Sequence, residues 1–268
     1  MKEPISLGVL TSGLNLEFME RGLPTIMAPS LNAGFVFRNE LLDQNFSWAF
    51  GVFRGESDSS DTSSVDIVGR VSGVPWKDEE KGRLLHLGVA YKLGVGEFDQ
   101  AYASRPETNW GDQWIGTGEI PSDGSHLLGI ELAGVWKPIS FQAELLSSWV
   151  SQSAGPTLNF WGAYGQLSYF LTGEQRHYLE TRRVFGRVRL NQDFSLRNRT
   201  WGALELAARY SYLDLDDGAI RGGSLSDITF GVNWYFQSNL RVMFNYTRAR
   251  LNGADNGNIV GTRFQIDY

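Results

Sequence analysis

The chain has 268 residues, contains no cysteine and carries 24 basic against 30 acidic residues, a formal net charge of −6 at pH 7. The absence of cysteine excludes a disulfide scaffold and thiolate metal sites, and the acidic balance argues against nucleic acid as a partner. The length allows one large β domain or two small ones, and because the sequence shows no domain boundary we expect a single domain over residues 1–268.

Short runs with an apolar residue at every second position follow one another along the chain, separated by Gly, Asp, Asn and Ser. Alternation of this kind predicts strands with one apolar and one polar face. About fourteen strands are predicted, at Leu31–Phe37, Phe46–Phe53, Val65–Val71, Leu84–Lys92, Phe98–Ser104, Trp110–Gly118, Leu127–Trp136, Ile139–Trp149, Leu158–Leu171, Arg183–Leu190, Trp201–Leu213, Asp227–Phe236, Leu240–Thr247 and Val260–Tyr268. No stretch approaches the roughly 18 uninterrupted apolar residues of a membrane-spanning helix.

The last forty residues show the alternation most clearly. In Asp227–Phe236 the apolar residues share one face, and Val260–Tyr268 repeats the pattern and ends on an aromatic residue. Aromatic residues near strand ends and alternating faces are typical of an antiparallel transmembrane β-barrel with lipid outside and water inside. Counting strands back from the last one places the Lys137-Pro138 turn on the outer side of the membrane.

The alternation also predicts which charged side chains face the lumen. Arg183, Arg187 and Arg189 share one face of a predicted strand, and we expect them to form a track that attracts anions. The alternative is that these arginines only pair with lumen carboxylates such as Glu205. The other cations predicted to face the lumen are Arg38, Arg70, Lys92, Arg209, Arg241 and Arg263.

Several short motifs resemble one family. They are Lys2-Glu3-Pro4 with Ser6-Leu7, Phe18-Met19-Glu20-Arg21, Leu84-Leu85-His86-Leu87-Gly88, Arg105-Pro106-Glu107, Tyr169-Phe170-Leu171-Thr172-Gly173-Glu174, Phe185-Gly186-Arg187-Val188, Glu205-Leu206-Ala207-Ala208-Arg209-Tyr210-Ser211 and the aromatic C-terminus. In this order, over nearly the whole chain, they resemble the phosphate-selective porin O and P family of outer-membrane porins.

This resemblance implies a sixteen-stranded, usually trimeric barrel in the bacterial outer membrane, with a constricted pore for anions such as phosphate. Lys2-Glu3-Pro4 matches a position well inside the family's barrel, so we expect about 12–14 strands here, without the N-terminal strands and the signal peptide. Phe18–Pro29 lacks alternation and carries Glu20 and Arg21, which predicts a loop folded into the pore as a constriction. The family's phosphate site also uses lysines, whereas Lys92 is the only clear lumen lysine of this chain, so general anion preference or a broad diffusion channel remain open.

The expected partners are outer-membrane lipid, lipopolysaccharide, two further copies in a homotrimer, and the barrel-assembly machinery, which the resemblance implies would recognise the strand ending at Tyr268. No enzyme activity, cofactor or metal site is predicted, because the three histidines lie on separate segments. The alternative functions are a structural or enzymatic outer-membrane barrel and a soluble β-sandwich binding domain. The C-terminal aromatic strand disfavours the sandwich.

Overall fold

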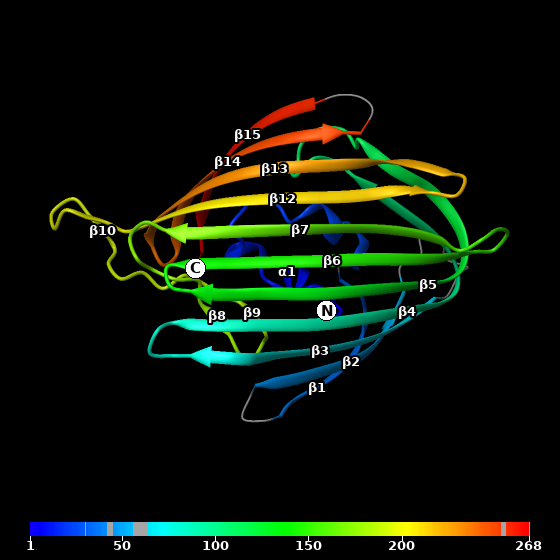
Figure 1. Cartoon of the computed structure of the whole chain (residues 1–268), viewed down its shortest axis with the longest axis horizontal. Helices are drawn as coiled ribbons and strands as arrows, with labels where there is room; N and C mark the ends of the chain where they lie inside the picture. Colours follow the sequence, from blue (N-terminus) through cyan, green and yellow to red (C-terminus); the bar gives the residue numbers. More distant parts are fainter. Residues whose placement is uncertain (30, 42–44, 56–63, 253–255, 268) are drawn as a thin grey trace.

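The computed structural model describes residues 1–29, 31–41, 45–55, 64–252 and 256–267. Eleven strands form one sheet in the order β1-β2-β3-β4-β5-β6-β7-β12-β13-β14-β15, and every neighbouring pair is antiparallel. The strands are β1 (Gly34–Leu41), β2 (Phe46–Arg54), β3 (Val65–Asp78), β4 (Arg83–Ser104), β5 (Ile115–Trp136), β6 (Ile139–Gln152), β7 (Leu158–Phe170), β12 (Ala203–Asp217), β13 (Ile220–Gln237), β14 (Leu240–Leu251) and β15 (Asn256–Ile266). The sheet curves into an arch with β1 and β15 at its edges (Figure 1). The predicted all-β, antiparallel class is confirmed.

The two faces of the arch differ as the alternation predicts. Along β13, Ile228, Phe230 and Val232 are exposed on the convex face, while Asp227, Thr229 and Asn233 are buried on the concave face. Such a polar inner face and apolar outer face are what a barrel wall needs when lipid lies outside. Tyr268, the predicted recognition residue of the last strand, lies outside the described residues.

Three of the predicted strands do not exist as separate strands of the sheet. Two predicted pairs are each one continuous strand of 22 residues, β4 and β5, because their Gly- and Pro-containing middles bend without ending the ladder. The third, Arg183–Leu190, is not a strand of the sheet at all. Where the sequence predicts 12–14 strands, the described residues form eleven wall strands and four strands of two residues each.

The segment predicted as the strand Arg183–Leu190 folds inside the arch instead. Only Val184–Phe185 (β9) pairs, with Tyr178–Leu179 (β8), and Arg183 has a left-handed backbone with φ of 52°. Phe185, which alternation places on the wet face, is fully buried in an apolar cluster within the arch. Burial of two consecutive apolar side chains against that cluster is favourable enough to override the alternation pattern.

Because Arg183–Leu190 is not a wall strand, the turns on either side of β6 lie at the opposite ends of the sheet from those predicted. With one wall strand fewer after it, the Lys137-Pro138 turn lies at the same end as the Ser238-Asn239 turn and the end of β15. The prediction that it lies on the opposite side was therefore wrong. Turns this short are typical of the periplasmic end of an outer-membrane barrel, where a two-residue connection is ordinary.

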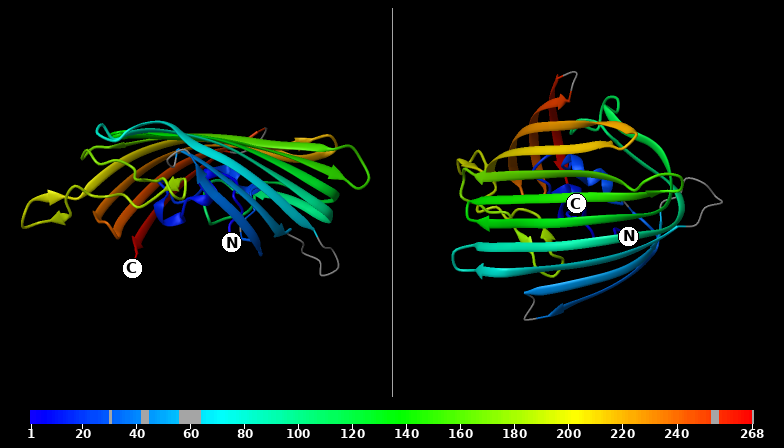
Figure 2. Two further views of the ribbon diagram at one scale, coloured as in Figure 1. Left: turned by 90° about the horizontal axis from the view of Figure 1, so that it is seen from below. Right: turned by 45° about the vertical axis from the view of Figure 1, so that its right-hand side comes forward.

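The first 28 residues lie in the hollow of the arch, against the concave face (Figure 2). They contain helix α1 (Leu7–Leu10) and two 3-10 turns, η1 (Gly13–Asn15) and η2 (Leu23–Met27). Ile5, Leu23 and Met27 are buried in one cluster with wall side chains, so the hydrophobic effect holds this segment to the wall. In the part of the chain that the structure describes, none of the helices is long and apolar enough to cross a bilayer.

Candidate functional site

The candidate site is the space between the concave wall and the segments that fold into it. Two segments line this space together with the wall: residues 1–28, and the connection between β4 and β5 at residues 105–114. A third, residues 171–202 between β7 and β12, enters it in part. Each is held by polar side chains of the wall.

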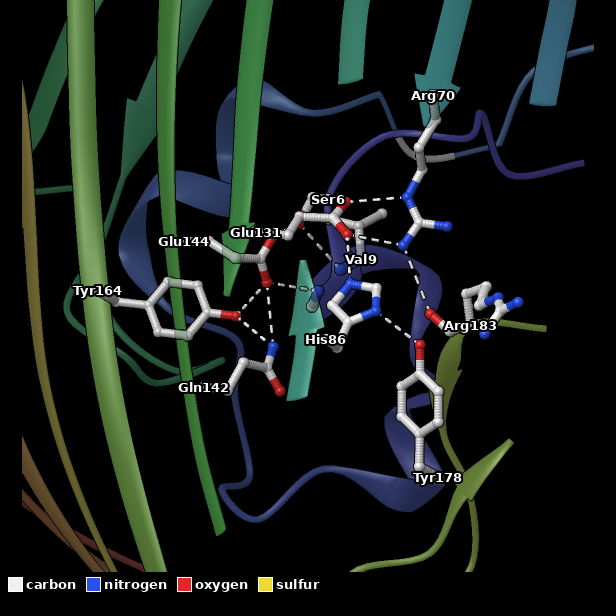
Figure 3. Close-up of polar contacts among 11 residues, drawn as sticks. Ser6, Val9, Arg70, His86, Glu131, Gln142, Glu144, Tyr164, Tyr178 and Arg183 are labelled. Atoms are coloured by element: carbon white, nitrogen blue, oxygen red, sulfur yellow. Dashed lines mark hydrogen bonds and ion pairs between the residues drawn. The ribbon is translucent and has the colours of Figure 1, made fainter. Parts of the chain in front are cut away.

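Glu144 on β6 holds the start of the N-terminal segment (Figure 3). Its Oε2 accepts a hydrogen bond from Ser6 Oγ at 2.6 Å, and its Oε1 accepts one from the Gly8 backbone N–H at 2.6 Å. Tyr164 and Gln142 also donate to Oε1. Because all these groups are buried, the carboxylate keeps its partners only if α1 stays in place.

Glu131 on β5 connects three further strands or segments (Figure 3). It accepts two hydrogen bonds from Arg70 on β3, at 3.0 and 2.7 Å, and lies 3.1 Å from His86 Nε2. Because a carboxylate only accepts, Nε2 carries the proton, and Nδ1 accepts from Tyr178 of β8 at 2.6 Å. Arg70 also donates to the backbone oxygen of Arg183 at 3.4 Å. This chain of contacts holds the 171–202 connection inside the arch.

Two more ion pairs fix the infolded segments. Glu17 of the N-terminal segment pairs with Arg176 at 2.8 Å, and the Glu17 backbone oxygen accepts from Asn233 on β13 at 2.8 Å. Burial raises the pKa of Glu17 to about 7 despite the arginine beside it. In the 105–114 connection, Glu107 pairs with Arg209 on β12, whose guanidinium lies 4.3 Å from the centre of the Phe18 ring.

The wall cations predicted from alternation are mostly neutralised. Four of them pair with carboxylates: Arg70 with Glu131, Lys92 with Asp66, Arg209 with Glu107 and Arg263 with Glu20. Arg241 donates to Gln265 and to the backbone oxygens of Leu14 and Leu16. Arg209, Arg241 and Arg263 anchor infolded segments to the wall, whereas the Lys92–Asp66 pair joins two wall strands.

The three arginines of the predicted track do not share a strand face, because their segment is not a strand of the sheet. Arg183 is buried, Arg187 is exposed and pairs with Asp267 at 3.3 Å, and Arg189 is exposed. Arg187 thus lies at the end of the arch where β15 finishes, whereas Arg183 lies against Arg70 in the interior of β3.

Arg21, predicted in a constriction segment, lies in the hollow of the arch and donates to two backbone oxygens, Gly8 O and Thr11 O, both at 2.9 Å. Lys2 donates to Val9 O and, at 3.4 Å, to the same Thr11 O. Burial lowers the pKa of Arg21, and burial together with the Arg21 charge lowers the pKa of Lys2. Two cations thus converge on one carbonyl, and within the described ranges neither has a carboxylate partner.

Arg105, in the connection between β4 and β5, is a third cation whose side chain, among the described residues, donates only to a backbone oxygen. It donates to the backbone oxygen of Asn109 at 3.1 Å and forms no ion pair with any residue that the structure describes. A cavity of about 340 Å³ lies between the two infolded segments and is lined by Arg21 and Arg105. Glu20 and Glu107 also line it, but their charges are balanced by Arg263 and Arg209. Two acidic and two basic side chains thus line the cavity, and of these four only the two basic ones have no ion-pair partner among the described residues.

Sequence reasoning missed Lys2 and Arg105 as site residues. Both belong to motifs that carried the family resemblance, Lys2-Glu3-Pro4 and Arg105-Pro106-Glu107. Neither lies on a wall strand, so strand alternation gave them no weight. The sequence did contain a signal for these two residues, because both belong to family motifs that lie outside the predicted strands.

A larger cavity of about 650 Å³ adjoins the first. It lies beside β14 and β15 and is lined by Glu20, Trp110, Trp114 and Arg263, among others. Glu20 and Glu107 line both cavities, so the two spaces meet at these residues. Within the described parts of the chain, no group of three or more acidic or histidine side chains is placed to hold a metal ion.

Gly22 allows the N-terminal segment to approach the wall. A Cβ at this position would lie 2.8 Å from ring atoms of Tyr164, closer than carbon atoms pack. We expect Gly22→Ala to lower the free energy of unfolding by about 1–3 kcal/mol, because the N-terminal segment must move away from Tyr164 to make room for the added methyl group. Chemical denaturation of the detergent-solubilised protein measures this.

Gly13→Ala is the matched control for that substitution. Gly13 also lies in the N-terminal segment, but a Cβ there meets nothing within 4 Å. Its denaturation midpoint should stay the same or rise slightly. Equal midpoints for the two variants would contradict the close packing of Gly22 on Tyr164.

Comparisons with known proteins agree with the sequence motifs. The family model "Phosphate-selective porin O and P" matches residues 1–268. Porin O of Pseudomonas aeruginosa is 28% identical over 256 residues, covering 81% of this chain and 57% of that protein. An uncharacterized protein of Caulobacter vibrioides is 28% identical over 228 residues, covering 80% of this chain and 45% of that protein. The chain thus spans about half the length of the curated relatives it matches.

Proposed function

Because this chain belongs to the phosphate-selective porin O and P family, we propose that the intact protein forms a water-filled channel through which small solutes diffuse passively. The protein resides in the bacterial outer membrane, where members of this family are found. The arch formed by β1–β7 and β12–β15 is then a part of the channel wall, with lipid on its convex face and water on its concave face. The role is that of a channel, not of an enzyme.

The preferred solutes of this channel are small anions such as phosphate. The observation that carries this proposal is the group formed by Lys2, Arg21 and Arg105, on segments folded into the hollow of the arch. Their positive charges have no carboxylate partner among the described residues, whereas most predicted wall cations are paired. Guanidinium and ammonium groups whose only partners are backbone oxygens keep donors available for an oxyanion.

Burial supports the same assignment. Burial lowers the pKa of both Lys2 and Arg21, because desolvation disfavours their charged forms. An anion beside them offsets part of this desolvation cost. Because screening acts over only about 8–10 Å at moderate ionic strength, the selectivity of the pore depends on such local charges and not on the net charge of −6.

The proposed assembly follows the family. The intact protein is a homotrimer in contact with outer-membrane lipid and lipopolysaccharide. The barrel-assembly machinery recognises the C-terminal strand β15 together with the aromatic Tyr268 that follows it in the sequence. A chemical cross-linking ladder on the purified protein that stops at three subunits supports the trimer.

Planar-bilayer recording of the intact protein tests the channel function. Stepwise conductance increases are expected as single channels insert, and a reversal potential in a salt gradient should show anion preference. A protein that inserts into bilayers but produces no steps would overturn the channel proposal. Steps with a cation-selective reversal potential would overturn only the anion preference.

A further inference from the structure

The hairpin formed by β10 (Phe194–Ser195) and β11 (Thr200–Trp201) projects from the end of the arch (Figure 1). Its base packs on the convex, lipid-facing side of β13. Phe194 contacts the rings of Trp234 and Phe236, with centroid distances of 5.8 and 5.3 Å. Trp234 Nε1 donates to the Trp201 backbone oxygen at 2.7 Å. The hairpin therefore starts at the outer surface of the barrel wall and not in the lumen.

The hairpin combines apolar and basic side chains. Leu196 and Trp201 are exposed by 84% and 69%. Arg197 and Arg199 are exposed as well, and neither forms an ion pair with any described residue. The nearest acidic residue in the sequence is Asp193, so the tip itself carries two positive charges.

The length of the hairpin sets how far its tip lies from the edge of the hydrocarbon layer. Phe194 and Trp201 lie at the level of Trp234 and Phe236, and aromatic residues at strand ends mark the edge of the hydrocarbon layer. Each arginine is two or three residues from the Phe194–Trp201 pair, a rise of about 7–10 Å in extended chain. The headgroup layer is about 5–8 Å thick on each side of a bilayer. The guanidinium groups, on long flexible side chains, therefore reach the depth of the lipid phosphates.

The hairpin lies at the end of the sheet with the two-residue turns Lys137-Pro138 and Ser238-Asn239. At the opposite end the Gly218-Ala219 turn also has two residues, but the β4–β5 connection there runs over residues 105–114. Short turns are typical of the periplasmic end of an outer-membrane barrel, and long connections are typical of the outer end. We propose that the β10–β11 hairpin is a docking surface for anionic phospholipid of the periplasmic leaflet, with Arg197 and Arg199 on the headgroup phosphate and Leu196 and Trp201 in the interface. Arginine pairs with phosphate through two parallel hydrogen bonds, and this gives the contact its preference for anionic lipid.

A fluorescent probe at the tip tests the proposal. The sequence has no cysteine, so Asn198→Cys gives this chain a single thiol between the two arginines. The labelled intact protein is placed in nanodiscs of phosphatidylethanolamine with phosphatidylglycerol (3:1), or of phosphatidylcholine alone, each with a small fraction of lipid that carries a nitroxide quencher on its headgroup. Quenching should be at least about twofold stronger in the anionic nanodiscs, since each arginine near an anionic surface favours contact by about fivefold.

Three variants of the labelled protein separate the possible causes. Arg197→Gln with Arg199→Gln should reduce quenching in the anionic nanodiscs to the level in phosphatidylcholine. Leu196→Ser should reduce quenching in both. Lys81→Gln with Lys137→Gln removes two exposed cations from the same end of the sheet and should leave quenching unchanged. All variants should retain channel conductance, which shows that they fold.

Two results would overturn the proposal. One is quenching that is equal in the two lipid compositions and insensitive to the loss of Arg197 and Arg199. The other is cross-linking of the introduced thiol to a neighbouring subunit in the membrane, which would assign the hairpin to a protein contact. Both outcomes leave the channel function untouched, because the hairpin lies outside the lumen.

Discussion

Replacing Lys2 and Arg21 together by glutamine is expected to move the reversal potential of the channel in a salt gradient strongly toward cations. A unit charge about 5 Å from a passing anion contributes roughly 3 kcal/mol at an effective dielectric constant of 20. Even after partial screening, we expect about a tenfold fall in the ratio of anion to cation permeability. Planar-bilayer recording with potassium phosphate and potassium chloride gradients measures it.

Two further variants with the same change in charge decide where the anion contact lies. Lys81→Gln with Lys137→Gln removes two exposed cations at the turns and should leave the reversal potential within experimental error of the parent. Arg187→Gln with Arg189→Gln tests the arginine track predicted from the sequence. If only this last variant shifts the potential, the anion contact belongs to the 171–202 connection and the assignment to Lys2 and Arg21 fails.

Glutamine at these positions is chosen to limit side effects on folding. Lys2 and Arg21 hydrogen-bond to backbone oxygens of residues 8–11, and a glutamine amide can still donate to them. A loss of selectivity together with unchanged conductance would therefore report on charge. A large rise in conductance would report that the N-terminal segment has left the hollow of the arch.

Replacing Glu131 by leucine is expected to produce the largest loss of stability of any change considered. It leaves Arg70 buried without its carboxylate partner, and an uncompensated buried charge typically costs about 3–5 kcal/mol. Both side chains of the pair are almost fully buried, with relative exposures of 6% and 0%. Urea denaturation in detergent micelles, followed by tryptophan fluorescence, measures the loss.

The single variant Arg70→Met and the double variant Arg70→Met with Glu131→Leu complete the thermodynamic cycle. Replacing both charges by apolar groups of similar size removes the uncompensated charge, so the double variant should recover most of the stability lost by Glu131→Leu alone. The neutral contact between His86 and Tyr178 remains in this variant. A double variant that is less stable than Glu131→Leu would show that the pair stabilises the fold by more than mutual neutralisation.

Glu180→Leu is the matched control for that cycle. Glu180 pairs with Lys77 at 2.6 Å, but about a third of its side chain and a quarter of the Lys77 side chain stay exposed. Exposed pairs of this kind contribute about 0–1 kcal/mol. A loss for Glu180→Leu as large as that for Glu131→Leu would indicate that burial is not what makes the Arg70–Glu131 pair important.

The alternation of apolar and polar residues along the strands was sufficient to predict which side chains of the wall face outward and which face inward. It predicted the outward face of β13 from Ile228, Phe230 and Val232, because side chains of a strand point to opposite sides in turn and a slip of one residue would put every polar group into lipid. It also predicted that Arg70, Arg209 and Arg263 face inward. It could not predict their partners, since Glu131, Glu107 and Glu20 are distant in the sequence and meet them only after folding.

The prediction of a strand at Arg183–Leu190 was wrong for a physical reason that is visible in the sequence. Phe185 follows Val184 directly, so one of the two apolar side chains had to lie on the wet face of any strand. Folding into the arch buries both of them with Leu7 and Val74. Removing that one strand also reversed the side assigned to Lys137-Pro138, because each strand added or lost exchanges the two ends of the barrel for every turn before it.

The sequence by itself determined that the chain forms an antiparallel wall with one apolar and one polar face, and its motifs indicated the family. These properties are local, since they depend on which residue type occupies every second position. Only the tertiary structure decided which cations stay available to a solute. Most lumen arginines are neutralised by carboxylates from other strands and infolded segments, whereas Lys2, Arg21 and Arg105 meet only backbone oxygens among the described residues. Charge compensation depends on distances between side chains far apart in the chain, and the packing of the infolded segments on the wall sets those distances.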